Sequence, residues 1–173
     1  MKLFRRLVVT AACLYSASSV HAAEPGLEKD EVAANLQRMD RLDFDAYSQR
    51  KDLKLFREMH CADVKVVFAD GRVTHGVEAH VADIDRLFNG TPDSRISSHD
   101  IAFGSGEWTA TAGFVEATFS EPMKLPDGKE ILPTGKKVKV PIATLARWKD
   151  GCIIQEHLFF DSAAYWRQLG LTK

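Results

Sequence analysis

The residue with the clearest potential for chemistry is Glu156, a carboxylate in a segment that is otherwise largely apolar. Alternation along a strand places it on one sheet face with four apolar side chains: Leu145, Ile154, Leu158 and Phe160. A carboxylate in such surroundings is costly unless it is paired, protonated or used. Two interpretations follow. Glu156 is either a general acid/base whose pKa is raised by apolar neighbours, or an ion-pair partner of its diagonal neighbour Arg147.

This placement rests on a predicted hairpin. Asp150-Gly151 lies between two apolar runs, which is typical of a two-residue turn whose residues both take positive φ. Counting from the turn predicts three cross-strand pairs: Trp148 with Ile153, Leu145 with Glu156, and Thr144 with His157. The opposite sheet face would then carry Ile142, Trp148, His157 and Phe159. We expect a second copy of the chain to cover that face, with His157 as an interface residue.

Histidines supply further candidates for catalysis. His80 belongs to a predicted helix over residues 76–88, where it either reaches a pocket or pairs with Asp83 at i+3. His75, His80 and Asp83 have the composition of metal ligands but not their usual spacing, so no metal is expected. His99 lies in a predicted strand and points to the face opposite Asp100, so these neighbours cannot form a dyad.

The first 22 residues read as a secretory signal. A positive start (Lys2, Arg5 and Arg6) precedes a short apolar core and small residues at Val20-His21-Ala22. A lipoprotein signal at Cys13 is the weaker alternative. We therefore expect a single domain over residues 23–173, periplasmic or secreted. Removing three cations and no acid moves the net charge from −1 to −4, which argues against nucleic acid or an anionic membrane as partner.

Cys61 and Cys152 would remain in the exported protein. An oxidising compartment allows one disulfide between them, and two buried thiols are the alternative.

Helices precede strands along the chain, which predicts an α+β fold with helices on one side of an antiparallel sheet. The expected helices cover residues 27–48, 51–59, 76–88 and 162–169. The expected strands cover residues 63–68, 73–75, 96–103, 108–119, 136–148 and 152–160. Small residues in strand 108–119 (Ala110, Ala112, Gly113 and Ala117) leave room for either a ligand pocket or a closely packed helix. The sequence has no nucleophile elbow, phosphate loop, dinucleotide fingerprint or zinc motif.

Several segments together resemble one family. They are Asp70-Gly71 after a strand, a helix opening at Gly76, Pro133-Thr134-Gly135-Lys136, Arg147 to Gly151, the Ile154/Glu156 strand, and Asp161 followed by Gln168-Leu169-Gly170. Over residues 36–171 the chain is similar to the SnoaL-like polyketide cyclases and ester cyclases of the nuclear transport factor 2-like superfamily.

The resemblance implies a curved sheet wrapped into a cone around the N-terminal helices, an internal pocket, and a homodimer formed through the outer sheet face. It also implies acid/base chemistry by one carboxylate, here Glu156, without metal or organic cofactor. If the first and last strands are neighbours, as in this family, Cys61 and Cys152 come close to each other.

We therefore expect an exported acid/base isomerase or cyclase acting on a small, largely apolar carbonyl compound. The candidate catalytic residues are Glu156, His99 and His80, and the candidate substrate contacts are Tyr47, Trp108, Arg147, Leu158 and Phe160. Tyr47 and Trp108 are equally compatible with a place in the core. The alternative function is that of a non-catalytic binding or interaction module of the same fold.

Overall fold

The computed structural model describes residues 25–125 and 127–171. The expected signal segment and Cys13 lie outside this range. The described helices are α1 (Pro25–Asp40), the π-helical turn η1 (Arg41–Tyr47), the 3₁₀ turn η2 (Ser48–Arg50), α2 (Leu53–Met59), α3 (Val77–Phe88) and α4 (Ser162–Gln168). The described strands are β1 (His60–Phe68), β2 (Val73–His75), β3 (Arg95–Ser105), β4 (Trp108–Thr118), β5 (Met123–Lys124), β6 (Glu130–Ile131), β7 (Lys137–Lys149) and β8 (Cys152–Phe160).

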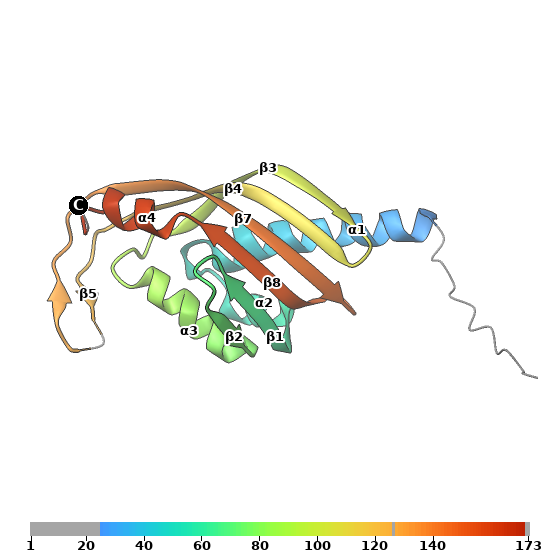
Figure 1. Cartoon of the computed structure of the whole chain (residues 1–173), viewed down its shortest axis with the longest axis horizontal. Helices are drawn as coiled ribbons and strands as arrows, with labels where there is room; N and C mark the ends of the chain where they lie inside the picture. The colour runs from blue at the N-terminus through green and yellow to red at the C-terminus, as the bar shows by residue number, and fades with distance from the viewer. Residues whose placement is uncertain (1–24, 126, 172–173) are drawn as a thin grey trace, which may run out of the picture.

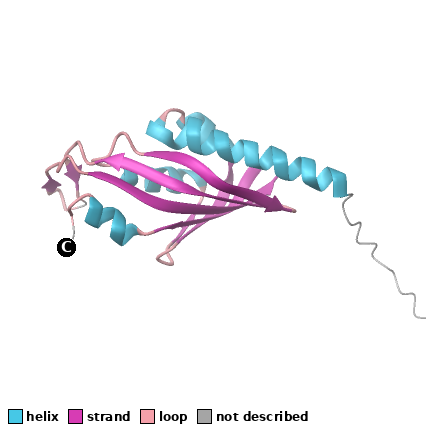
Figure 2. Cartoon of the chain, turned by 90° about the horizontal axis from the view of Figure 1, so that it is seen from above, coloured by secondary structure: helices cyan, strands magenta, loops and turns pink. Residues whose placement is uncertain are grey.

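The described strands form one six-stranded sheet in the order β2-β1-β8-β7-β4-β3, and a small β5-β6 ribbon (Figure 1). All neighbours in the large sheet are antiparallel except β1 and β8, which run parallel. Helices α1, α2 and α3 lie against one face of this curved sheet, as Figure 2 shows from above. The expected α+β architecture is therefore confirmed, including the adjacency of the first and last long strands.

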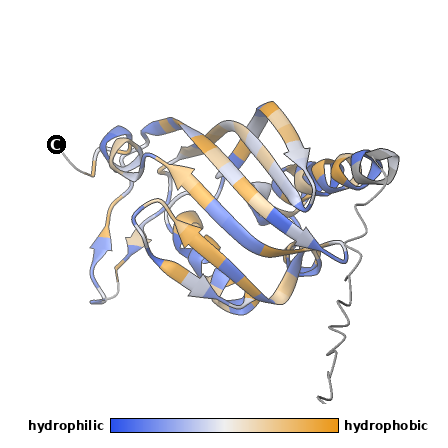
Figure 3. Cartoon of the chain, turned by 45° about the vertical axis from the view of Figure 1, so that its right-hand side comes forward, coloured by the Kyte–Doolittle hydropathy of each residue, from blue (hydrophilic) through white to orange (hydrophobic). Residues whose placement is uncertain are grey.

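The core lies between the helices and the inner sheet face. Along β4 and β7 buried and more exposed residues alternate. Figure 3 shows that hydropathy also changes along the ribbons of the sheet. Such a period-two pattern is expected when one face of an antiparallel sheet is packed and the other is not. None of the described helices combines the length and the apolar character needed to cross a bilayer.

The predicted hairpin forms, but its register shifts by one residue beyond the turn. Asp150 and Gly151 have φ values of 50° and 82°, and Trp148 pairs with Ile153 as predicted. An irregularity after Trp148 then pairs Arg147 with Gln155. One extra residue on β8 makes this a β-bulge. Beyond the bulge, the residues of β8 point to the opposite sheet face from the one that strict alternation predicts.

The expected pairs of Leu145 with Glu156 and Thr144 with His157 are therefore wrong. Ala146 lies opposite Glu156, and Leu145 lies opposite His157. The composition expected for the outer face changes accordingly. Trp148 is 2% exposed and belongs to the core, where its Nε1 donates to Oγ1 of Thr109 at 2.8 Å.

Cys61 and Cys152 form a disulfide that joins β1 to β8, with 5.2 Å between their Cα atoms. The disulfide was one of two possibilities left open by the sequence. It lies at the end of the parallel β1–β8 pair, where His60 is the register partner of Ile153. The bond therefore fixes the start of β1, including His60, next to the strand that carries Glu156.

Candidate functional site

Glu156 lies on the inner face of β8 and is 4% exposed. Its Oε2 is 3.1 Å from Nε2 of His80 and 3.6 Å from Nε2 of His60. The three side chains come from β8, α3 and the first residue of β1, and all three are buried. A carboxylate between two imidazoles is thus the first of two titratable clusters, and it is called the Glu156 cluster below.

Phe56 organises the two imidazoles of this cluster. Its ring lies 4.5 Å from the His60 ring and 5.2 Å from the His80 ring, measured between centroids. Its carbonyl oxygen accepts a hydrogen bond from Nδ1 of His60 at 2.7 Å. Because a carbonyl can only accept, His60 carries a proton on Nδ1, and its Nε2 is the atom directed at Glu156.

Two opposing effects act on the Glu156 carboxyl group. Burial raises its pKa, but the adjacent imidazoles of His60 and His80 outweigh this effect and hold the pKa below its usual range. The expected rise caused by apolar neighbours is therefore reversed by two residues distant in sequence. The alternative pairing with Arg147 is also wrong, because Arg147 lies on the outer face and binds Glu107, with Nε 2.8 Å from Oε2.

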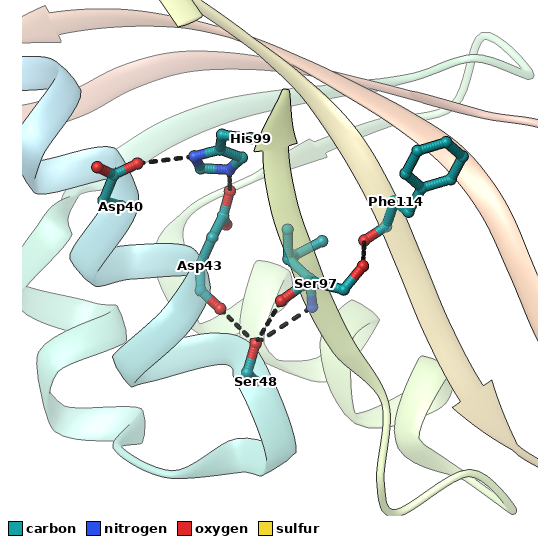
Figure 4. Close-up of polar contacts among 7 residues, drawn as sticks. Asp40, Asp43, Ser48, Ser97, His99 and Phe114 are labelled. Carbon is teal, nitrogen blue, oxygen red and sulfur yellow. Dashed lines mark hydrogen bonds and ion pairs between the residues drawn. The ribbon is translucent and has the colours of Figure 1, made fainter. Parts of the chain in front are cut away.

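His99 forms a second cluster with the opposite arrangement, an imidazole between two carboxylates (Figure 4). Its Nδ1 is 2.8 Å from Oδ1 of Asp40 at the end of α1, and its Nε2 is 2.8 Å from Oδ2 of Asp43 in η1. The π-helical turn places Asp43 on the inner side while Asp40 stays 55% exposed. Extra residues inserted into a helix in this way are frequent at functional sites.

Burial and pairing act on both members of this Asp43–His99 cluster. Burial raises the pKa of Asp43, and the hydrogen bond and charge of His99 only partly oppose that rise. For His99, burial lowers the pKa, but the hydrogen bonds and charges of Asp43 and Asp40 outweigh it, so the pKa is raised. The folded protein therefore favours a proton on this cluster.

The two clusters meet at an internal cavity of about 50 Å³. Asp43, His80, Thr144 and Glu156 are polar residues of its lining. Its apolar walls are formed by Tyr47, Phe56, Phe68, Ile84, Leu87, Ile96, Ile142, Leu158 and Phe160. Cavities for drug-sized ligands are typically about 300–1,000 Å³. In this conformation the cavity therefore suits only a small molecule or one end of a larger one.

The predicted substrate contacts divide into two groups. Tyr47, Leu158 and Phe160 line the cavity as expected. Burial raises the pKa of Tyr47, which keeps its hydroxyl protonated, and this hydroxyl hydrogen-bonds Oγ of Ser94 at 3.1 Å. Trp108 and Arg147 are register partners on the outer face, so neither contacts the cavity and that expectation is wrong. Both misplacements follow from assigning faces without the tertiary structure.

Of the two histidines predicted to be catalytic, His80 lines the cavity and His99 does not. His80 points to Glu156 rather than to Asp83, whose carboxylate instead accepts from Thr74 and pairs with Arg72 and Arg86. The loose set of His75, His80 and Asp83 therefore does not assemble. His99 approaches the cavity only through Asp43.

Two residues of the site were missed from the sequence. His60 was left without a role, and Asp43 was not considered. The available signal for Asp43 was an acid between Leu42 and Phe44, four residues after Met39, on the apolar side of a predicted helix. No comparable signal marks His60, since its partners are 20 and 96 positions away in the sequence.

Comparison with known families agrees with this geometry. Residues 38–169 match the family described as SnoaL-like polyketide cyclase. The chain belongs to this family. The match spans both clusters and the whole six-stranded sheet. A search of curated proteins found no match to the chain.

Solved structures confirm the fold of this SnoaL-like protein. A SnoaL-like protein from Jannaschia sp. CCS1 is similar at 22% identity and TM-score 0.69, with 82% of this chain and 94% of that chain covered. An NTF2-like protein of unknown function from Burkholderia pseudomallei K96243 shares 20% identity at TM-score 0.62, with 79% of this chain and 97% of that chain covered. A hypothetical protein with a ketosteroid isomerase-like fold from Catenulispora acidiphila was solved in complex with trimethylamine. It shares 15% identity at TM-score 0.56, with 82% of this chain and 94% of that chain covered.

Proposed function

We propose that this SnoaL-like protein is an acid/base enzyme that isomerises or cyclises a small, largely apolar carbonyl compound. The observation that carries the proposal is the cavity itself. Its walls are largely apolar, and the carboxylates of Glu156 and Asp43 and the imidazole of His80 line it together. A pocket with apolar walls and a few convergent polar groups is the usual form of a small-molecule site.

The two carboxylates suit different halves of a proton transfer. Glu156, ionised between two imidazoles, accepts a proton from the carbon next to the carbonyl group, and the electron pair of that C–H bond moves into the carbonyl to give an enolate. Asp43, whose pKa is raised by burial, donates a hydrogen bond to the oxygen on which the enolate charge develops. In an isomerase Glu156 then returns its proton to another carbon, so both carboxyl groups end as they began. In a cyclase the enolate carbon attacks a second carbonyl of the same molecule, Asp43 protonates the resulting alkoxide, and the proton on Glu156 passes back to Asp43 through solvent.

A small probe tests this proposal without knowledge of the natural substrate. The β,γ-unsaturated isomer of cyclohexenone becomes the conjugated isomer by one proton removal and one proton return, and the conjugated product absorbs in the ultraviolet. In D₂O the same enolisation introduces deuterium, which NMR detects. We expect the protein to accelerate both processes and the Glu156→Gln variant to lose about 10²- to 10⁴-fold of that rate.

Glu107→Gln is the matched control, because Glu107 is an exposed glutamate on the outer face. Its rate should equal that of the wild type. Binding of the probe without isomerisation or deuterium uptake would contradict the enzyme proposal and favour the alternative of a non-catalytic binding module.

We also propose that the protein acts outside the cytoplasm. The signal-like first 22 residues support export, and the Cys61–Cys152 disulfide is the kind of bond that persists in oxidising compartments. Fractionation of cells expressing the full chain, with mass spectrometry of the N-terminus, tests this. A protein retained in the cytoplasm with Met1 intact would contradict it.

A homodimer is the remaining part of the proposal. Five large apolar side chains on the outer sheet face are 38–63% exposed: Ile101, Phe103, Trp108, Leu145 and Phe159. An apolar face of this kind is usual for an interface rather than for a monomer surface. Sedimentation at micromolar concentration should show a dimer, and Phe159→Asp should shift it to monomer. A wild-type monomer would contradict this part.

A further inference from the structure

The Glu156 cluster contains buried polar atoms that lack a hydrogen bond among the described residues, although Oε2 of Glu156 forms an ion pair with His80. Nε2 of His60, Nδ1 of His80 and Oε2 of Glu156 are buried, and none has a hydrogen-bond partner within the described part of the chain. Buried polar atoms are nearly always hydrogen-bonded, so three in one cluster call for an explanation. Burial of an unsatisfied polar group costs about 1–3 kcal/mol in general.

The tautomer of His60 sharpens the problem. Because its Nδ1 donates to the carbonyl of Phe56, a neutral His60 has a lone pair on Nε2. That lone pair is directed at the ionised Oε2 of Glu156 across 3.6 Å. Two electron-rich atoms at this distance repel unless a cation lies between them, either a proton or a metal ion.

Two of the three separations in the cluster, those from Glu156 to each imidazole, are close to those in the coordination sphere of a small metal ion. Tetrahedral Zn²⁺ with bonds of about 2.0–2.1 Å separates its ligand atoms by about 3.3–3.4 Å. Oε2 of Glu156 is 3.1 Å from Nε2 of His80 and 3.6 Å from Nε2 of His60, on either side of that value. The potential ligand atoms of all three residues lie within 4.8 Å of one another, and no other such group of three is found among the described residues.

The groups around these three side chains also suit a bound metal ion. Histidines that bind metals usually donate their other ring N–H to a carbonyl or carboxylate, as His60 does to Phe56. Two imidazole nitrogens with one carboxylate oxygen form a ligand set of catalytic zinc sites, where a fourth position stays open. His80 and Glu156 both line the cavity, so a fourth ligand would come from the cavity side.

We propose that His60, His80 and Glu156 bind one divalent transition-metal ion, with Zn²⁺ as the ion that best fits the ligands. Imidazoles disfavour Mg²⁺ and Ca²⁺, which take oxygen ligands. The expectation that the protein has no metal site rested on ligand spacing along the chain. The present ligands lie at positions 60, 80 and 156, and only the fold brings them together.

This inference is independent of the proposed acid/base function. An Oε2 atom bound to Zn²⁺ no longer accepts a proton, so the two uses of Glu156 exclude each other at any one time. We therefore expect added Zn²⁺ to suppress isomerisation of the cyclohexenone probe. Metal binding can be measured without any turnover, so failure of one proposal leaves the other to be judged separately.

The experiment is titration of the purified chain, carrying no polyhistidine tag, with Zn²⁺ after dialysis against a chelator. Calorimetry should show one ion bound per chain, and the melting temperature should rise with Zn²⁺ concentration. Co²⁺ should give the visible absorption of a tetrahedral site. His60→Gln, His80→Gln and Glu156→Gln should each weaken binding by more than the roughly 10–100-fold lost with an outer-shell partner.

His75→Gln and His157→Gln are the matched controls, since both residues lie outside the cluster and should leave affinity unchanged. Each variant is first checked by its cooperative melting without metal. Should one of the imidazole variants unfold, Glu156→Gln and the Co²⁺ spectrum decide the question. Absence of saturable one-to-one binding in the wild type would overturn the proposal, and so would binding that survives all three ligand changes.

Discussion

The Glu156 cluster and the Asp43–His99 cluster are built from the same side chains in inverse proportion. One has a carboxylate between two imidazoles, and the other has an imidazole between two carboxylates. In the second cluster both ring nitrogens of His99 have a carboxylate oxygen at 2.8 Å, and one carboxylate is open to solvent. In the first, three buried atoms have no hydrogen-bond partner among the described residues.

The difference separates structural from functional use of the same chemistry. A cluster whose hydrogen bonds are complete stabilises the fold, and here it ties β3 to α1 and η1. A cluster that leaves buried atoms unsatisfied costs stability, and such a cost is common where a site must bind or react. The comparison predicts that changes at His99 and Asp40 alter stability, whereas changes in the Glu156 cluster alter binding and rate. Asp43 belongs to both sets, because it pairs with His99 and also lines the cavity.

The largest effect on stability should come from the Cys61–Cys152 disulfide. Replacing both cysteines by serine releases a loop of 91 residues and should lower the free energy of unfolding by about 4 kcal/mol. Urea unfolding of both proteins measures this. Because the bond lies next to His60, NMR signals of the His60 ring should shift while those of His99 do not. Two free thiols titrated in denatured wild-type protein would contradict the premise.

His99→Leu should cause the next largest loss in the free energy of unfolding. It removes the shared partner of two carboxylates and leaves Asp43, with only 15% of its side chain exposed, without a cation. We expect a loss of about 3 kcal/mol, at the lower end for breaking a buried ion pair, because Asp43 can take up a proton. Asp40→Asn is the control, since Asp40 is exposed and should cost less than about 1 kcal/mol. Equal effects of the two changes would argue against this ranking.

The pH dependence of stability should have opposite signs in the two clusters. The pKa of His99 is raised, so its contribution is complete below the ordinary value of 6.5 and is lost as pH rises through the folded-state pKa. The pKa of Glu156 is lowered, so its contribution is present above the ordinary value of 4.5 and is lost as pH falls. Each slope can reach about 1.4 kcal/mol per pH unit for one proton.

Denaturant unfolding measured from about pH 4 to about pH 9 gives these slopes, because this pH range spans the ordinary pKa values of carboxyl and imidazole groups. His99→Leu should flatten the slope above pH 6.5. It should also change the slope on the acid side, because loss of His99 raises the pKa of Asp43 further. A wild-type protein that gains stability as pH rises through that upper range would show that the sign for His99 is wrong.

Glu156→Gln should change stability least, by about 1 kcal/mol or less, because the glutamine amide has the same shape and can donate to the lone pair of His60. Arg147 does not depend on Glu156, so no arginine loses its partner, and each neighbouring imidazole can be neutral beside the glutamine amide. Thermal melting measures this. A loss of about 3–5 kcal/mol, the range for a broken buried pair, would make Glu156 a structural residue instead.

Much of the fold was readable from the sequence because its signals are local. The Asp150-Gly151 turn, the apolar stripe of the helix over residues 76–88, and the order of helices before strands all depend on neighbouring residues. The bulge on β8 was not predictable in this way. It changed the partner of Glu156 from Leu145 to Ala146 and moved Trp148 from the outer face to the core.

The candidate site shows the same division. The sequence by itself singled out Glu156, because a lone carboxylate in an apolar strand violates a local rule, and it determined the family through motifs spread along the chain. Only the tertiary structure decided that His60 and His80, rather than Arg147, are the partners of Glu156. Side-chain alternation is set within a strand, whereas the parallel pairing of β1 with β8 and the packing of α3 depend on contacts between distant segments, which no spacing along the chain encodes.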